Sequence, residues 1–163
     1  MMTIKTYDPA MQPAVETCFK SCVAALGWEY QPSGRHADIV NIGGVYMKHG
    51  CFWCLFEDET LIGMVAARCL DEQSGVAEIK RLYVLPEYQG RGYGGLLFGH
   101  ALDYVKAQGY KTVRADTRRD RAASLYLLGK YRFRQVEKYN ENAFAELYFE
   151  LDLAAQPVTP WAP

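Results

Sequence analysis

The sequence predicts an α+β domain with a mixed, mostly antiparallel central sheet of six to seven strands flanked by helices. Two features favour this class. Three runs rich in β-branched and aromatic residues follow one another across short turns, at 51–57, 61–70 and 76–85, which is typical of an antiparallel meander. A single strand–helix–strand unit comes next, and one such unit is too few for a sheet that is parallel throughout.

The residues before the meander favour a strand and two helices. Residues 3–8 alternate like a short strand. Residues 11–26 place their apolar side chains on one helical face, and Gly27 is a C-terminal stop. Residues 36–48 predict a second, weaker helix, because two adjacent glycines interrupt the pattern.

The residues after the meander complete the sheet. We expect, in order, a helix at 96–108, a strand at 111–116, a helix at 121–128 with Asp120 as its N-cap, and strands at 131–139 and 144–153. The prediction is one domain over residues 1–153. A flexible tail over residues 154–163 follows, because that segment contains three prolines.

The third strand of the meander, at 76–85, has an irregular pattern. Ala77 and Ile79 share one face, whereas Leu82 and Val84 share the other. The apolar phase therefore slips by one residue across the Lys80–Arg81 pair, which predicts a β-bulge.

Composition narrows the possible functions. The chain has 163 residues and a formal net charge of −1, so nothing in its charge recruits nucleic acid or an anionic membrane. The four arginines of 114–121 are interleaved with aspartates, which favours a solvated face. The N-terminal stretch lacks the features of a signal peptide and no apolar run is long enough to span a membrane, so we expect a cytoplasmic protein.

The five cysteines do not predict a metal or disulfide site. Cys51 and Cys54 form a Cys-x-x-Cys pair, but residues three apart on a strand face opposite sides of the sheet. No second pair follows, and the three histidines lack metal-ligand spacing. We expect structural thiols and no metal.

The stretch PEYQGRGYGGLLF predicts a phosphate site. Four glycines lie within six residues, Gly90 to Gly95, immediately before the helix pattern begins. Glycine lets the backbone approach a phosphate closely, and the first N–H groups of a helix attract anions. Arg91 adds a cation. The alternative is a tight turn that uses the glycines only for their conformational freedom.

A dinucleotide-binding loop is the rival interpretation. Gly90, Gly92 and Gly95 match G-x-G-x-x-G, and Asp116 ends the next strand, where such folds place a ribose-binding acid. Here, however, four residues separate the strand from the first glycine, and the chain offers one βαβ unit where that fold needs a series. No G-K-[ST] sequence exists, which excludes a P-loop.

The run RLYVLPEYQGRGYGGLLF resembles the acyl-CoA signature of the GNAT superfamily of N-acetyltransferases. Its core pattern, [RQ]-x-x-G-x-[GA], reads here as residues 89–94, after a strand ending in Tyr-Val and a proline. The order of elements is similar to that of the family from about residue 3 to residue 153.

This resemblance implies a binding mode for acetyl-CoA as co-substrate. The pyrophosphate would lie on the signature loop, which maps to Gln89, Gly90, Arg91, Gly92, Tyr93, Gly94 and Gly95. The pantetheine would pair with the backbone of Leu82, Tyr83 and Val84. A backbone N–H at or near Val84, freed by the bulge, would stabilise the oxyanion.

A second family motif, N-x-x-A-x-x-x-Y-x-x-x-G-F, is partly matched. Ala122 and Tyr126 have the required spacing, and Ala122 is implied to line the cofactor site. Arg119 stands where asparagine is usual, which leaves that cofactor contact open. Gly129 comes one residue early and Phe133 two residues late, so the turn into the next strand must differ.

The resemblance also implies the reaction, in which the acetyl group passes from acetyl-CoA to a primary amine by direct attack. Glu78 is the candidate base, with a solvent-facing charge as the alternative. Tyr126 is the candidate acid that protonates the leaving thiolate, with a core-packed aromatic as the alternative. A non-catalytic acyl-CoA sensor on the same fold is the other functional reading.

The acceptor side is less defined. Tyr139, Trp28, Tyr30 and Trp53 could line an acceptor pocket or pack in the core. A small-molecule or peptide amine is expected, and analogy with relatives that pair through terminal strands suggests a homodimer.

Overall fold

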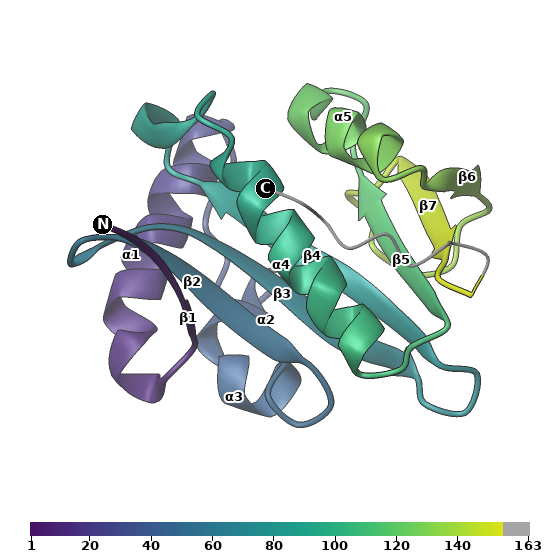
Figure 1. The fold of residues 1–163 in the computed structure, drawn as a ribbon. Helices are drawn as coiled ribbons and strands as arrows, with labels where there is room; N and C mark the ends of the chain where they lie inside the picture. The colour runs from purple at the N-terminus through teal and green to yellow at the C-terminus, as the bar shows by residue number, and fades with distance from the viewer. Residues whose placement is uncertain (155–163) are drawn as a thin grey trace. The chain divides into compact units, whose positions relative to one another are not determined.

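The computed structural model describes residues 1–154. The predicted tail, 154–163, lies outside these residues except for Ala154. Seven strands form one sheet in the order β1-β2-β3-β4-β5-β7-β6 (Figure 1). This number lies within the six to seven strands that the sequence predicts. The strands are β1 (Met2–Thr6), β2 (Cys51–Glu57), β3 (Thr60–Asp71), β4 (Val76–Val84), β5 (Thr112–Thr117), β6 (Arg134–Val136) and β7 (Leu147–Asp152).

Five α-helices and two short 3₁₀ helices occur within residues 1–154. They are η1 (Pro9–Met11), α1 (Gln12–Ala25), α2 (Ala37–Val40), α3 (Ile42–Val45), η2 (Pro86–Tyr88), α4 (Tyr93–Ala107) and α5 (Ala122–Lys130). The single helix expected at 36–48 is wrong, because the backbone breaks at Asn41, whose side chain caps α3 by accepting from the Gly44 N–H.

Strand directions exclude the dinucleotide fold. β4 and β5 are parallel, whereas β1–β2, β2–β3, β5–β7 and β6–β7 are antiparallel. A dinucleotide-binding sheet is built from successive parallel βαβ units. The NAD-binding alternative is therefore wrong for this fold.

The chain forms two compact units. The first comprises Met1–Arg68 and Ile79–Asp103, and the second comprises Cys69–Glu78 and the chain from Tyr104 onward. β3, β4 and α4 each contribute residues to both units.

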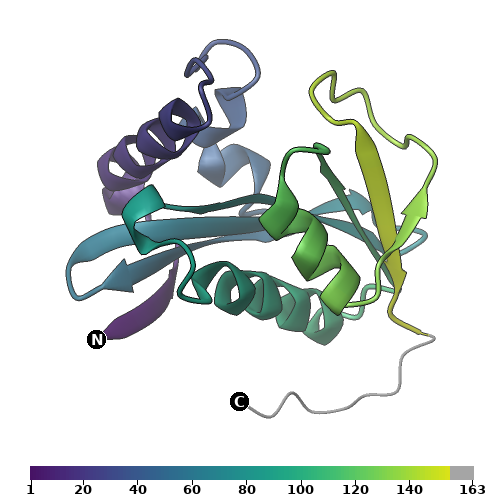
Figure 2. The ribbon, with the colours of Figure 1, turned by 90° about the horizontal axis from the view of Figure 1, so that it is seen from above.

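In the first unit, helices cover both faces of the strands. Figure 2 shows α1, α2 and α3 on one face of β2 and β3, and α4 on the other. β2 is accordingly apolar throughout: Phe52 and Cys54 pack in the cluster under α1 to α3, while Trp53 meets the ring of His100 on α4 at 5.2 Å. Two covered faces explain why β2 lacks the alternation of a half-exposed strand. Cys51 and Cys54 are both buried, as free thiols.

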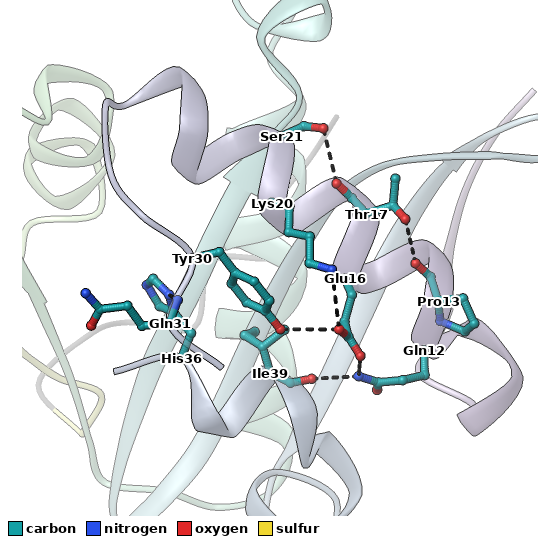
Figure 3. Close-up of polar contacts among 10 residues, drawn as sticks. All are labelled: Gln12, Pro13, Glu16, Thr17, Lys20, Ser21, Tyr30, Gln31, His36 and Ile39. Atoms are coloured by element: carbon teal, nitrogen blue, oxygen red, sulfur yellow. Dashed lines mark hydrogen bonds and ion pairs between the residues drawn. The ribbon is translucent and has the colours of Figure 1, made fainter. Parts of the chain in front are cut away.

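A polar cluster joins α1 to α2 in this unit (Figure 3). Gln12 Nε2 donates to Glu16 Oε1 at 2.8 Å and to the Ile39 carbonyl at 2.9 Å. The Tyr30 hydroxyl donates to Glu16 Oε2 at 3.3 Å, and Lys20 pairs with the same oxygen at 3.9 Å. The cluster fixes the short helix α2, which carries Asp38, against α1.

The second unit contains β5, β6, β7 and α5. β5 pairs in parallel with the first residues of β4, from Val76 opposite Thr112 to Glu78 opposite Arg114. The prediction of Asp120 as N-cap of α5 is wrong: Arg121 occupies the cap position, where its side chain makes no capping hydrogen bond, and Asp120 accepts from Arg118 Nε. The strand expected at 131–139 is reduced to the three residues of β6.

Candidate active site

The irregularity predicted in β4 occurs at Arg81. Its φ is +56°, a left-handed conformation that a non-glycine residue rarely adopts. The preceding residues of β4, Val76 to Ile79, are buried, whereas Lys80 to Val84 are partly exposed. The slip in apolar phase therefore marked a true change in the backbone.

Two hydrogen bonds from nearby residues fix the end of β4. The Leu85 N–H donates to the Ile62 carbonyl at 2.8 Å, and Gln89 Nε2 donates to the Val84 carbonyl at 2.9 Å. β3 approaches closely here, since a Cβ on Gly63 would lie 2.9 Å from the Tyr83 carbonyl oxygen. These bonds fix the end of β4 at Val84 and Leu85, and the Val84 carbonyl is already engaged by Gln89.

The glycines divide into two pairs. Gly90 and Gly92 have φ values of +76° and +84°, and a Cβ at either position would meet nothing within 4 Å. Gly94 and Gly95 instead lie in the first turn of α4, which begins at Tyr93 and not at residue 96 as predicted. The loop is therefore shorter than expected, and the open space beside it fits a ligand that approaches the backbone.

The first N–H groups of α4 have no partner within the helix. The first intrahelical bond described runs from the Leu96 N–H to the Gly92 carbonyl at 3.0 Å. The N–H groups of Tyr93, Gly94 and Gly95 precede it and cannot bond within the helix. Arg91 is exposed, donates from Nη2 to the Glu87 carbonyl at 3.1 Å and lies over the Tyr88 ring.

Glu78 is completely buried, so the solvent-facing alternative is wrong. Its Oε2 accepts from the Tyr139 hydroxyl at 2.6 Å and from Asn140 Nδ2 at 3.3 Å. Asn140 Nδ2 also donates to Asp116 Oδ2 at 2.7 Å, and Asn142 Nδ2 reaches the same oxygen at 3.2 Å. The segment between β6 and β7 therefore supplies donors to both carboxylates.

The sequence offers Tyr139 either for an acceptor pocket or for the core and does not predict its bond to Glu78. Its ring meets Tyr148 edge-on at 5.5 Å, and the Arg114 guanidinium lies over it at 5.1 Å. No local pattern joins residues 61 positions apart. In the sequence, the one indication of these donors is that Tyr139 and Asn140 are adjacent and follow a short strand.

Tyr126 is 69% exposed on α5, so the core-packed alternative is wrong. Ala122 is the first residue of this helix. Arg119 is exposed, and its backbone N–H donates to Glu146 Oε2 at 2.8 Å.

The sequence also does not predict an ion pair that joins β4 to α2. Arg81 Nε and Nη2 donate to Asp38 Oδ2 and Oδ1 at 2.8 and 2.7 Å, and Nη2 reaches the Arg35 carbonyl at 2.9 Å. The Tyr46 hydroxyl donates to Asp38 as well. Burial opposes ionisation of Asp38, but the Arg81 contacts outweigh it, so the pKa of Asp38 lies below its ordinary value.

Two features are absent from the described residues. Within residues 1–154, no three histidine, cysteine or acidic side chains gather where they could hold a metal ion. None of the helices in that range has the length and apolar character needed to cross a membrane.

Comparisons with known proteins agree with the fold and the motif. The sequence model of the acetyltransferase (GNAT) family matches residues 15–132. The chain is 30% identical over 106 residues to YedL, an uncharacterised N-acetyltransferase of Escherichia coli, covering 65% of this chain and 64% of that protein. It is 33% identical over 149 residues to a mycothiol acetyltransferase of Tsukamurella paurometabola, covering 85% of this chain and 50% of that protein.

A solved acetyltransferase of Staphylococcus aureus shares the fold, with a TM-score of 0.84, 15% identity, and coverage of 94% of this chain and 99% of that one. The chain spans less than two thirds of the length of either relative named above. The family match nevertheless covers most of the chain. This protein belongs to the GNAT acetyltransferase family.

Proposed function

We propose that this protein transfers the acetyl group of acetyl-CoA to a primary amine by direct attack within a ternary complex. The observation that carries the proposal is the buried carboxylate of Glu78, which Tyr139 and Asn140 hold on the strand that leads into the glycine loop. A buried carboxylate costs stability unless it is paired, so a fixed one on this strand indicates a functional group.

The glycine loop and the start of α4 would bind the pyrophosphate. Gly90 and Gly92 leave open space beside the backbone, and the N–H groups of Tyr93 to Gly95 supply donors at a helix N-terminus. Gln89 contributes by fixing the loop to the Val84 carbonyl, and Arg91 contributes charge. Leu82, Tyr83 and Val84 would pair with the pantetheine through their remaining backbone groups.

Glu78 would act as the general base. An amine holds its proton at neutral pH, and Glu78 would take it directly or through water, so that the nitrogen lone pair can attack the thioester carbon. A backbone N–H at or near Val84 would stabilise the resulting oxyanion. The C–S bond then breaks, and Tyr126 would give its proton to the leaving thiolate; its exposure leaves the hydroxyl accessible. Arg119 and Ala122 are proposed to line the cofactor site at the start of α5.

Two further proposals concern organisation. Residues 1–153 are proposed to form one domain, because β3 and β4 run through both compact units. The acceptor is proposed to be a small-molecule or peptide amine, and a homodimer is proposed by analogy with the family.

Calorimetric titration with acetyl-CoA, beside NAD, tests the binding step. The loop predicts binding of acetyl-CoA alone, and Gly92→Asp, which adds a negative charge, should weaken it. A thiol-release assay with a panel of amines then tests turnover. Glu78→Gln should lower kcat about 10²- to 10⁴-fold and leave acetyl-CoA affinity unchanged.

The alternative is a non-catalytic acyl-CoA sensor. It predicts binding without turnover by any amine, and Glu78→Gln and Tyr126→Phe would then change nothing measurable in the assay. Loss of turnover with retained binding in both variants supports the enzyme. A protein that ignores acetyl-CoA altogether contradicts both.

A further inference from the structure

The Arg81–Asp38 ion pair ties the irregular residue of β4 to helix α2. Both side chains are largely buried, at 14% and 17% exposure, and the guanidinium meets both carboxylate oxygens. Bidentate pairs of this kind fix orientation as well as charge. The contact spans 43 positions of the sequence, so it is a feature of the fold and not of local helix geometry.

Several contacts reinforce this geometry. The Arg81 guanidinium also reaches the Arg35 carbonyl and lies over the Phe19 ring at 5.5 Å, and the Tyr46 hydroxyl donates to Asp38. His36 is completely buried two residues from Asp38. Burial, with the charges of Arg81 and Arg35, lowers the pKa of His36 to about 4, so it is neutral and does not compete for the carboxylate.

The left-handed backbone conformation of Arg81 costs free energy unless contacts such as the ion pair with Asp38 stabilise it. A left-handed conformation disfavours any residue with a Cβ, and such residues persist only where their surroundings determine them. The conformation also sets the phase of β4 beyond it. Arg81 and Tyr83 both contact Phe19, and a slip of one residue would turn Tyr83 to the opposite face.

We propose that Arg81 is a positioning residue whose ion pair with Asp38 holds the left-handed backbone at position 81 and so directs the backbone groups of Leu82, Tyr83 and Val84 at the acyl-CoA. This inference rests on the proposed function, because it assigns those backbone groups to the acyl-CoA. Neither Arg81 nor Asp38 touches the reacting atoms in this scheme.

Two substitutions at position 81 separate the backbone from the side chain. Arg81→Gly and Arg81→Ala both delete the guanidinium, but glycine adopts positive φ readily and alanine does not. Acetyl-CoA affinity, measured by calorimetry, should therefore fall about tenfold further in Arg81→Ala than in Arg81→Gly. For acetyl-CoA turnover, kcat/KM should follow the same order, whereas the KM of the amine should stay unchanged.

Arg132 supplies a matched control. It is also a non-glycine residue with positive φ, at +61°, in the turn after α5. Arg132→Gly and Arg132→Ala should differ in thermal stability and not in acetyl-CoA affinity. A difference in affinity at position 132 equal to that at position 81 would show a global effect of stability and overturn the inference.

Asp38→Asn tests the same idea if Arg81→Ala fails to fold. It should weaken acetyl-CoA binding in the wild-type background and add nothing in the Arg81→Gly background, because glycine no longer needs the anchor. Equal losses in Arg81→Gly and Arg81→Ala, or additive losses with Asp38→Asn, would overturn the positioning role. Either result, with wild-type binding intact, leaves the proposed function standing, whereas a wild-type protein that ignores acetyl-CoA contradicts the function itself.

Discussion

The hydroxyl of Tyr139 donates a 2.6 Å hydrogen bond to Oε2 of Glu78, the completely buried carboxylate of β4. This bond and the second one from Asn140 replace the water that Glu78 loses on burial. They also restrict the rotation of the carboxylate. If Glu78 is the base, its effectiveness depends on this orientation.

Tyr139→Phe should therefore lower kcat about 10- to 100-fold and leave acetyl-CoA affinity unchanged. The loss corresponds to one hydrogen bond to a charged group, about 1.5–3 kcal/mol. The ring contacts with Tyr148 and Arg114 survive in phenylalanine, so the segment should stay folded. Steady-state kinetics with saturating acetyl-CoA give the measurement.

Tyr7→Phe is the matched control for this prediction. It removes a hydroxyl whose 2.7 Å bond goes to Gln12 and not to Glu78. Its kcat should equal that of the wild type. A Tyr139→Phe enzyme with full kcat would mean that the carboxylate does not need this donor.

The sequence predicted those parts of the site that local patterns encode. The apolar slip in β4 located the left-handed Arg81, and the clustered glycines located the turns at Gly90 and Gly92. Both depend on the chain's own backbone preferences, which a short stretch of sequence carries.

The missing parts depend on distant partners. The donors to Glu78 come from the segment that contains Tyr139 and Asn140, and Arg81 meets Asp38 across 43 positions. Sequence periodicity cannot report such pairs. The error at Asp120 is local instead: α5 begins one residue later than expected, with Arg121 at the cap position, and Asp120 pairs with Arg118 two positions away.

Gly92→Ala should destabilise the protein by about 1–2 kcal/mol through its backbone alone. Its φ is +84°, and the added methyl group would meet nothing within 4 Å, so strain is the only cost in the free protein. Chemical denaturation measures the change, and acetyl-CoA affinity should fall as well if the backbone binds the pyrophosphate.

Gly129→Ala is the control for this substitution. Its added methyl group also meets open space, but Gly129 lies within α5 at an ordinary helical φ. The variant should be more stable by up to about 1 kcal/mol, with unchanged acetyl-CoA affinity. A stabilised Gly92→Ala protein would contradict the backbone argument.

Gly63→Ala should destabilise the protein more than Gly92→Ala, because its methyl group would lie 2.9 Å from the Tyr83 carbonyl oxygen and 3.1 Å from the Leu97 side chain. The first of these is a backbone atom of β4, which can move only if the strand moves. Thermal unfolding should show a lower Tm. An unchanged Tm would mean that β4 adjusts freely at this point.

His36 should make the protein less stable as the pH falls from about 6.5 to 4. Its ring is completely buried between Phe19 and Tyr30, and burial lowers its pKa to about 4 (Figure 3 shows it beside Gln31 and Tyr30). The unfolded chain binds the proton near pH 6.5, whereas the folded chain resists it. Acidification therefore favours unfolding, and this one group should cost about 2 kcal/mol between pH 7 and pH 5.

The matched variant is His36→Asn. Nδ1 of His36 accepts from the Gln31 backbone N–H at 3.0 Å, and an asparagine oxygen can take that bond without titrating. Within the described residues Nε2 has no partner, so its removal breaks no hydrogen bond. Burial also lowers the pKa of His100, whose share of the pH dependence persists in the variant. Urea denaturation at pH 7 and pH 5 should show that the variant loses less free energy of unfolding on acidification than the wild type does. Equal losses in the two proteins would mean that His36 is protonated in the folded protein.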